Sequence, residues 1–190
     1  MNPADESERQ AGLTGTWLPR TQYIATLPKS TTYACLYFTD SAGRPFQLRS
    51  TRQTELWQNP GGNMDPGESP WQTALRECRE ETSLDVTSLR PTLLLTHFIG
   101  PRHDWPHAHI GFIFDGGILT PDQLDRIVLD PHEHTEWSIR SMDTWEKEMK
   151  PHTFARLKAT DAARRSGIPG YLESDGRLEP LGREERGEPA

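Results

Sequence analysis

Residues 62–84 read GNMDPGESPWQTALRECREETSL and carry the clearest structural signal of the chain. Ser69 is a favoured N-cap residue, Pro70 suits the first helical position, and Gln72 completes a capping box with Ser69. The sequence therefore predicts a helix from about Pro70 to about Thr82. The proline- and glycine-rich residues 60–67 before it predict a loop without regular structure, which follows the end of a strand at Trp57.

The predicted helix carries different residues on its two faces. Bulky or small apolar residues recur at spacings of four and three, which predicts a stripe that packs on a core. This stripe consists of Trp71, Leu75, Cys78 and Thr82. We expect the opposite face to border a solvent-accessible cleft.

That opposite face carries Glu77, Glu80 and Glu81, at positions i, i+3 and i+4. Like charges at these spacings repel one another, and the arginines at positions 76 and 79 offset only part of the repulsion. A divalent cation would offset more, and carboxylate oxygens suit Mg²⁺ or Mn²⁺. The simpler alternative is a solvated acidic helix face.

The whole stretch resembles the signature of the Nudix hydrolases, G-x5-E-x7-R-E-U-x-E-E-x-G-U, where U is a bulky apolar residue. The positions that match in register are Gly62, Glu68, Arg76, Glu77, Glu80, Glu81 and Leu84. Cys78 takes an apolar position and is a small hydrophobe. Ser83 replaces a glycine that would end the helix with positive φ, so we expect strain or a different helix end there.

The resemblance implies a metal site and a reaction. The implied metal ligands are the carbonyl oxygen of Gly61 and the carboxylates of Glu77, Glu80 and Glu81. Arg76 and Glu68 would orient those carboxylates, and we count Arg76, Glu80 and Glu81 among the catalytic residues. The implied reaction is hydrolysis of a nucleoside diphosphate linked to a group X, with Mg²⁺ or Mn²⁺ as cofactor.

The general base is predicted less directly. Relatives use either a glutamate of the signature or an acid on a later loop, and residues 130–136 (DPHEHTE) lie about where that loop is expected. Glu133 is the first candidate and Glu136 the second. The alternative for both is a surface acid without a catalytic role.

Substrate contacts are predicted outside the signature. Arg49, Arg52 and Arg102 are candidates for phosphate contacts. His107 and His109 alternate at the start of a predicted strand and would point the same way, toward substrate or solvent. Asn59 stands where the family more often has an apolar residue, so it could face the substrate. Zinc is a weak alternative, because the spacing of the histidines at 103, 107, 109, 132 and 134 fits no standard zinc pattern.

The rest of the chain predicts a mixed α/β fold. Residues 33–38 and 45–49 form two strands joined by a turn at 40–43, which predicts a hairpin. Further elements are expected at 21–27 (helix), 92–99, 110–115 and 136–139 (strands) and 151–165 (helix). The Nudix resemblance implies an α/β/α sandwich with a mixed central sheet over about residues 30–165.

Composition bounds the organisation and the environment. The 190 residues predict a flexible segment at 1–16, one domain at 17–173 and a flexible tail at 174–190. A net charge of −7 argues against general nucleic-acid binding. Two cysteines make no disulfide framework, and the absence of a long apolar stretch or a signal peptide predicts a cytoplasmic protein without a membrane partner. A homodimer stays open.

Three functions are compatible with these patterns. The first is a Nudix hydrolase acting on a small, nucleotide-derived diphosphate. The second is a catalytically silent Nudix-like domain that binds a nucleotide as a sensor, and the third is an interaction domain with an incidental acidic helix. All ligand glutamates and the signature arginine are present, which favours the first. The substrate motifs of coenzyme A, diadenosine polyphosphate, ADP-ribose and NADH enzymes are not matched cleanly, so the substrate stays open.

Overall fold

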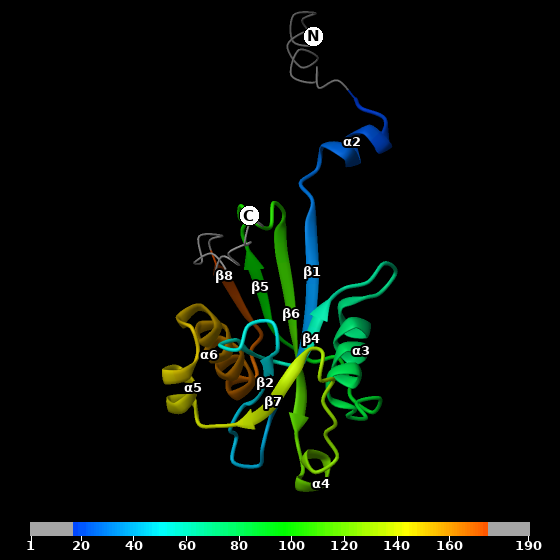
Figure 1. Ribbon diagram of the computed structural model, residues 1–190. Helices are drawn as coiled ribbons and strands as arrows, with labels where there is room; N and C mark the ends of the chain where they lie inside the picture. Colours follow the sequence, from blue (N-terminus) through cyan, green and yellow to red (C-terminus); the bar gives the residue numbers. More distant parts are fainter. Residues whose placement is uncertain (1–16, 175–190) are drawn as a thin grey trace, which may run out of the picture.

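The computed structural model describes residues 17–174, which form two β-sheets flanked by helices (Figure 1). The flexible ends predicted at 1–16 and 174–190 lie outside the described residues, except for Ser174, which ends a strand. In chain order the elements are α2 (Arg20–Thr26), β1 (Ser30–Thr39), β2 (Phe46–Ser50), β3 (Trp57–Gln58), β4 (Gly61–Asn63), α3 (Pro70–Thr82), β5 (Leu93–Ile99), β6 (Ala108–Ile118), α4 (Pro121–Leu124), β7 (His134–Ile139), α5 (Met142–Glu148), α6 (Pro151–Ser166) and β8 (Gly170–Ser174).

The larger sheet has the strand order β4-β1-β6-β5-β8. β1 pairs in parallel with β6 and antiparallel with β4, while β5 pairs antiparallel with β6 and in parallel with β8. The mixed central sheet that the Nudix resemblance implied is therefore confirmed. β4 and β8 were not predicted, because the GGN of β4 has no strand-forming side chains and lies in the stretch that we expected to be irregular.

The predicted hairpin is wrong. β1 and β2 share only an isolated bridge between Thr39 and Pro45, although the turn between them forms as expected. β2 instead pairs with β3 and β7 in a second sheet of order β3-β2-β7. Two apolar strands joined by a short turn look like a hairpin in sequence, but here the chain leaves one sheet and enters the other.

The alternating side chains of β1 divide the core into two parts. Leu36 and its neighbours at even positions pack with Ala74 and Cys78 of α3, while Tyr37 and its neighbours at odd positions pack with Leu157 of α6 and with α5. Helices thus cover both faces of the large sheet, with α3 on one side and α5 and α6 on the other (Figure 1). This is the three-layer α/β/α arrangement.

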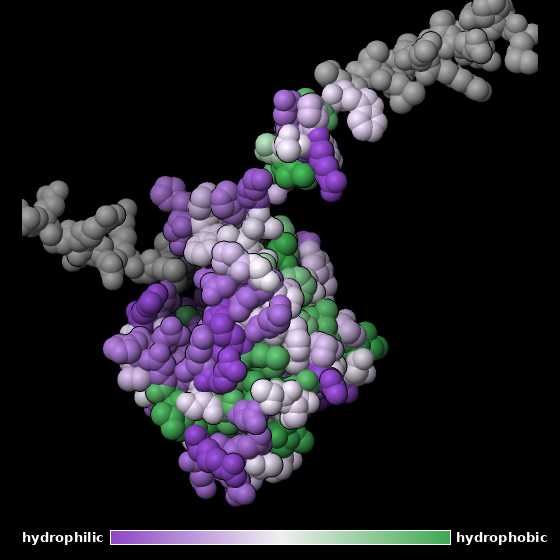
Figure 2. All heavy atoms as spheres, turned by 90° about the vertical axis from the view of Figure 1, so that its right-hand side faces the viewer, coloured by the Kyte–Doolittle hydropathy of each residue, from purple (hydrophilic) through white to green (hydrophobic). Residues whose placement is uncertain are grey.

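α2 stands away from the rest of the domain at the end of the long strand β1 (Figures 1 and 2). None of its residues is buried, and Tyr23 and Ile24 are exposed. Among residues 17–174, no helix combines the length and the apolar character needed to cross a membrane.

Candidate active site

Helix α3 has the predicted bounds and the predicted start. The Gln72 amide donates to the Ser69 hydroxyl, and the Ser69 amide donates to the Gln72 side chain, at 2.8 Å in the second case. At the other end Ser83 adopts the left-handed conformation with φ 60°, and its amide donates to the Arg79 carbonyl. The strain expected from serine in place of glycine is therefore present.

The face of α3 that packs on the core is broader than predicted. Cys78 is fully buried as expected, but Trp71 and Leu75 are only partly buried at the edge of the core. The small residues Thr73 and Ala74 are fully buried instead. Their size allows the helix to approach the sheet closely, and small residues give no signal in a pattern of bulky apolar side chains.

Glu81 is buried, which corrects the expectation that it faces solvent. Its side chain is 3% exposed, because its carboxylate lies between Gly61 of β4 and His134 of β7. The Gly61 amide donates to Oε2 at 2.7 Å, and His134 Nε2 lies 2.8 Å from Oε1. Burial raises the pKa of Glu81, although the His134 hydrogen bond opposes this rise. Burial lowers the pKa of His134, but the hydrogen bond and charge of Glu81, together with a backbone hydrogen bond to Arg49 and the charge of Glu133, raise it above the ordinary value.

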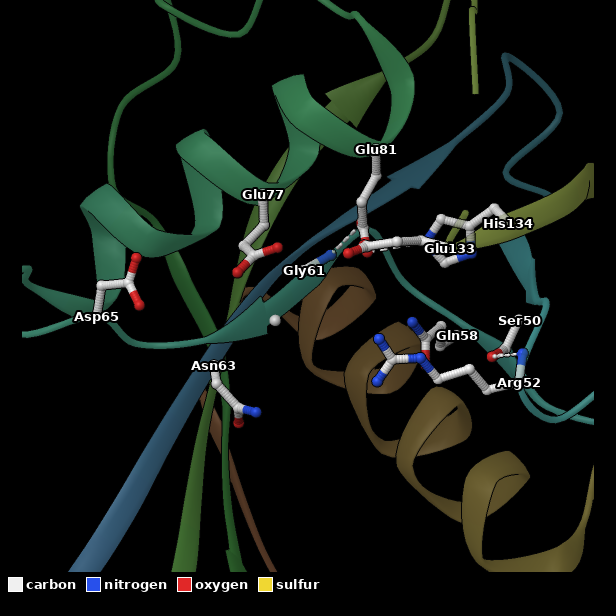
Figure 3. Close-up of a pocket in the computed structure, with 11 residues that line it drawn as sticks. Ser50, Arg52, Gln58, Gly61, Asn63, Asp65, Glu77, Glu81, Glu133 and His134 are labelled. Carbon is white, nitrogen blue, oxygen red and sulfur yellow. Dashed lines mark hydrogen bonds and ion pairs between the residues drawn. The ribbon is translucent and has the colours of Figure 1, made fainter. Parts of the chain in front are cut away.

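Three glutamate carboxylates converge on a hollow of about 320 Å³ between α3, β4 and the start of β7 (Figure 3). Glu77 and Glu81 come from α3, and Glu133 comes from the loop before β7. Ligand atoms of Glu81, Glu133 and His134 all lie within 4.8 Å of one another. Burial raises the pKa of Glu77 against the effect of the neighbouring arginine, and the charge of Glu133 raises it further.

Arg76 holds the acids at the edge of this hollow. Its guanidinium donates to Glu68 at 2.7 and 3.0 Å, to Glu77 at 2.8 Å and to Glu80 at 3.0 Å. The hydrogen bonds from Arg76 lower the pKa of Glu68 to about 2. These contacts support the orienting roles that the resemblance implied for Arg76 and Glu68. Glu80 is exposed and does not line the hollow, because its carboxylate turns toward Arg76.

Only one of the predicted phosphate-binding arginines lines the hollow. Arg52 does so from the loop after β2 (Figure 3). Arg49 is bound to Glu136 at 2.8 Å on the second sheet, so the alternative base candidate Glu136 is also engaged away from the hollow. Arg102 lies near Asp104 in the segment before β6.

The other predicted substrate contacts lie elsewhere. Asn59 is only 5% exposed and accepts a hydrogen bond from Gln47 at 2.5 Å, so the expectation that it faces the substrate is wrong. His107 is exposed, whereas His109 stacks on Tyr33 and does not line the acidic hollow. Burial lowers the pKa of His109 to about 4, and the positive charges of nearby arginines contribute to this lowering.

His134, the hydrogen-bond partner of Glu81, is not among the predicted site residues. In the sequence it belongs only to a group of histidines whose spacing fits no standard zinc pattern. His134 follows Glu133 directly and is the first residue of β7, so the alternation of a strand turns it inward while Glu133 reaches the hollow from the loop. Gln58, Asn63 and Asp65 also line the hollow and carried no signal of their own.

The arrangement suits a hard divalent cation. Three acids approach one another, and two of them have raised pKa values because burial withdraws water from them. A cation that binds carboxylate oxygens would relieve the repulsion between these acids. Proteins hold Mg²⁺ or Mn²⁺ through such carboxylates together with substrate phosphates. Arg52 adds a positive charge at the rim.

Comparisons with known proteins agree with this geometry. Residues 28–162, more than half of the chain, match the family described as NUDIX domain. The chain is 43% identical over 59 residues to an 8-oxo-dGTP diphosphatase of Proteus vulgaris, covering 31% of this chain and 47% of that protein. It is 56% identical over 32 residues to an RNA pyrophosphohydrolase of Rhodopseudomonas palustris (strain BisB18), covering 17% of this chain and 18% of that protein.

Solved structures show the same fold. A MutT protein from Bacillus halodurans superposes with a TM-score of 0.60 at 19% identity, covering 80% of this chain and 95% of that chain. The chain spans less than half the length of the two curated relatives named above. The match over residues 28–162 establishes the family, and the similarity to solved structures establishes the fold.

Proposed function

The chain belongs to the Nudix family, and on that premise we propose that it is a metal-dependent pyrophosphohydrolase. Its substrate is a small diphosphate derived from a nucleotide, and water cleaves the phosphoanhydride bond. The family relatives whose names describe diphosphatase and pyrophosphohydrolase activity support this reaction class.

One observation carries the proposal, namely the convergence of Glu77, Glu81 and Glu133 on a single hollow (Figure 3). Two of these acids are largely withdrawn from water, at 14% and 3% side-chain exposure. Burying like charges together destabilises a fold unless a counter-charge is supplied. Arg76 and His134 each contact one of these acids, and a divalent ion is the further counter-charge that the donor set fits.

Glu77 and Glu81 would hold the ion, with the carbonyl oxygen of Gly61 and with Glu80 as further ligands. Glu80 would first have to turn from Arg76, to which it is bound. When bound, Mg²⁺ or Mn²⁺ neutralises charge on the diphosphate and lowers the pKa of water. His134 keeps the Glu81 carboxylate in place from the side opposite α3.

The protein side chains would then perform the proton transfer. Glu133 accepts a proton from the attacking water as the water oxygen bonds to phosphorus, and the bridging P–O bond breaks. The leaving phosphate takes the electron pair, so the products are a nucleoside monophosphate and phosphorylated X. Arg52 at the rim would contact a phosphate oxygen.

A release assay tests this function. The full chain is incubated with nucleoside triphosphates, dinucleotides, nucleoside diphosphate sugars and prenyl diphosphates, with Mg²⁺, with Mn²⁺ and with excess chelator. Glu81→Gln and Glu80→Gln should each lower kcat by at least about 10²-fold. Glu136→Gln is the matched control, because Glu136 is an exposed acid bound to Arg49 away from the hollow.

Turnover of the best substrate in excess chelator would contradict the metal dependence. A near wild-type rate for Glu81→Gln, with an unchanged melting curve, would contradict its role as a ligand. Tight binding of a panel member without product would favour the sensor function. The predicted cytoplasmic location, the homodimer and the lack of general nucleic-acid binding are tested by fractionation, light scattering and a gel-shift assay.

A further inference from the structure

A second hollow of about 430 Å³ adjoins the acidic one. It lies between the start of β1, the loop after β4 and Trp105, and it shares Asn63 and Asp65 with the acidic hollow. These two residues stand at the end of the acidic hollow opposite His134 (Figure 3). A diphosphate at the carboxylates could therefore extend its substituent past Asn63 into the second hollow.

The walls of the second hollow are largely apolar. Met64, Pro66 and Trp105 contribute large apolar surfaces, and Met64 is a flexible side chain that adapts to different shapes. Among residues 17–174, Asp65 is the only charged residue that lines it. Its negative charge disfavours a phosphate and leaves a neutral or cationic group as the occupant.

Trp105 is fixed in place before any ligand binds. Its indole N–H donates to the Thr31 hydroxyl at 2.8 Å, and its backbone closes a turn with Arg102. Its ring packs on His109 at 5.1 Å, and His109 stacks on Tyr33 at 4.7 Å. Because the indole N–H is already used, the ring offers a rigid apolar face, and a prearranged wall lowers the entropy cost of binding.

We propose that this second hollow binds a flat, uncharged aromatic group attached to the diphosphate, stacked on Trp105 and covered by Met64. The inference rests on the proposed function, because the diphosphate links the two hollows. Such a ring could be the nucleobase or an aromatic group X. Stacking of a base on an aromatic side chain is tolerant of the identity of the base.

Binding measurements without turnover test the proposal. Calorimetry with Mg²⁺ compares α,β-methylene-ADP, which carries a base, with methylenediphosphonate, which carries none. The full chain should bind the nucleotide analogue at least about tenfold more tightly, and Trp105→Ala should remove that preference while leaving methylenediphosphonate unchanged. Trp105→Phe should keep most of the preference, and Met64→Ser should weaken it a few-fold.

Trp17→Ala is the matched control, because Trp17 is 97% exposed. We expect this substitution to leave the affinities for both probes unchanged. A phenyl ester of methylenediphosphonate separates the two sources of the ring. Preference for both ring-bearing probes assigns the hollow to any flat ring, and preference for the nucleotide alone assigns it to the nucleobase; either supports the proposal.

Three results would overturn it. In the first, Trp105→Ala keeps the full preference for α,β-methylene-ADP over methylenediphosphonate. In the second, that variant loses affinity equally for both probes. In the third, the wild-type protein binds both probes with the same affinity. Loss of the ring preference in Trp105→Ala without hydrolysis of any panel substrate would refute the proposed reaction and keep the ring site. Hydrolysis without a ring preference would do the reverse.

Discussion

Gly62→Ala should damage the active site while leaving the fold intact. A Cβ atom at Gly62 would lie 2.5 Å from Glu77 Oε1 and 2.7 Å from Oε2, well inside an ordinary contact of 3.4 Å or more. The carboxylate is the end of a flexible side chain, so it can move away by roughly 1 Å. A displacement of about 1 Å at a reacting centre can cost about 10²-fold in rate.

The assay pairs activity with stability. We expect kcat/KM of the best substrate to fall by about 10²-fold and the Mg²⁺ concentration for half-maximal activity to rise. The melting temperature should stay within a few degrees, because alanine suits a strand at least as well as glycine. Gly61→Ala is the contrast, since its Cβ would lie 2.2 Å from Cys35 Cβ and 2.3 Å from the Ala34 carbonyl and should prevent folding.

Gly43→Ala serves as the matched control for a glycine substitution. Among residues 17–174, no atom other than those of its two chain neighbours lies within 4 Å of its Cβ position, but its φ of 74° makes alanine cost about 1 kcal/mol of stability without loss of activity. If Gly62→Ala retained full activity and Mg²⁺ dependence, Glu77 would not need its observed position, and its assignment as a ligand would be refuted.

Three further predictions follow from other contacts. Glu133→Gln should lower kcat by about 10²–10⁴-fold with little change in substrate affinity, whereas Glu136→Gln should leave kcat unchanged. If steady-state kinetics showed the loss in Glu136→Gln and not in Glu133→Gln, Glu136 would be the general base. Ser83→Gly should raise the free energy of unfolding by about 1 kcal/mol in urea titrations, because it relieves a φ of 60°; a loss would mean that the Ser83 hydroxyl bond to the Val128 carbonyl matters more. Burial lowers the pKa of His97 to about 4, so the unfolded chain binds a proton at this residue at a higher pH than the folded chain does. The free energy of unfolding should therefore fall as the pH drops from about 6.5 toward 4. Urea titrations of His97→Gln should show a smaller fall than those of the wild type, and an equal fall would contradict the assignment.

Local chemistry in the sequence was sufficient for helix α3. The capping box, the proline at the first position and the residue after Thr82 act within a few bonds, so the predicted bounds hold. The same is true of the strain at Ser83. The spacing of the glutamates also determined that Glu77 and Glu81 lie on one side of the helix.

Distant contacts decided the rest. One of the two partners of β2 is β7, some ninety positions later, and no turn signal between β1 and β2 reveals that the chain changes sheets. Glu81 became a buried acid because the Gly61 amide from β4 and His134 from β7 supply its hydrogen bonds. Asn59 points inward because its side-chain oxygen accepts a hydrogen bond from Gln47, twelve residues earlier.

The family signature and the acidic helix could thus be predicted from the residues alone, because they depend on residue identity and helical period. Which acids share one hollow follows from the packing of distant elements. Glu133 joins Glu77 and Glu81 while Glu80 turns to Arg76, because packing between α3, β4 and β7 fixes the distances between side chains far apart in the chain. Spacing along a helix sets the direction of a side chain, and only the packing of other elements sets what it meets.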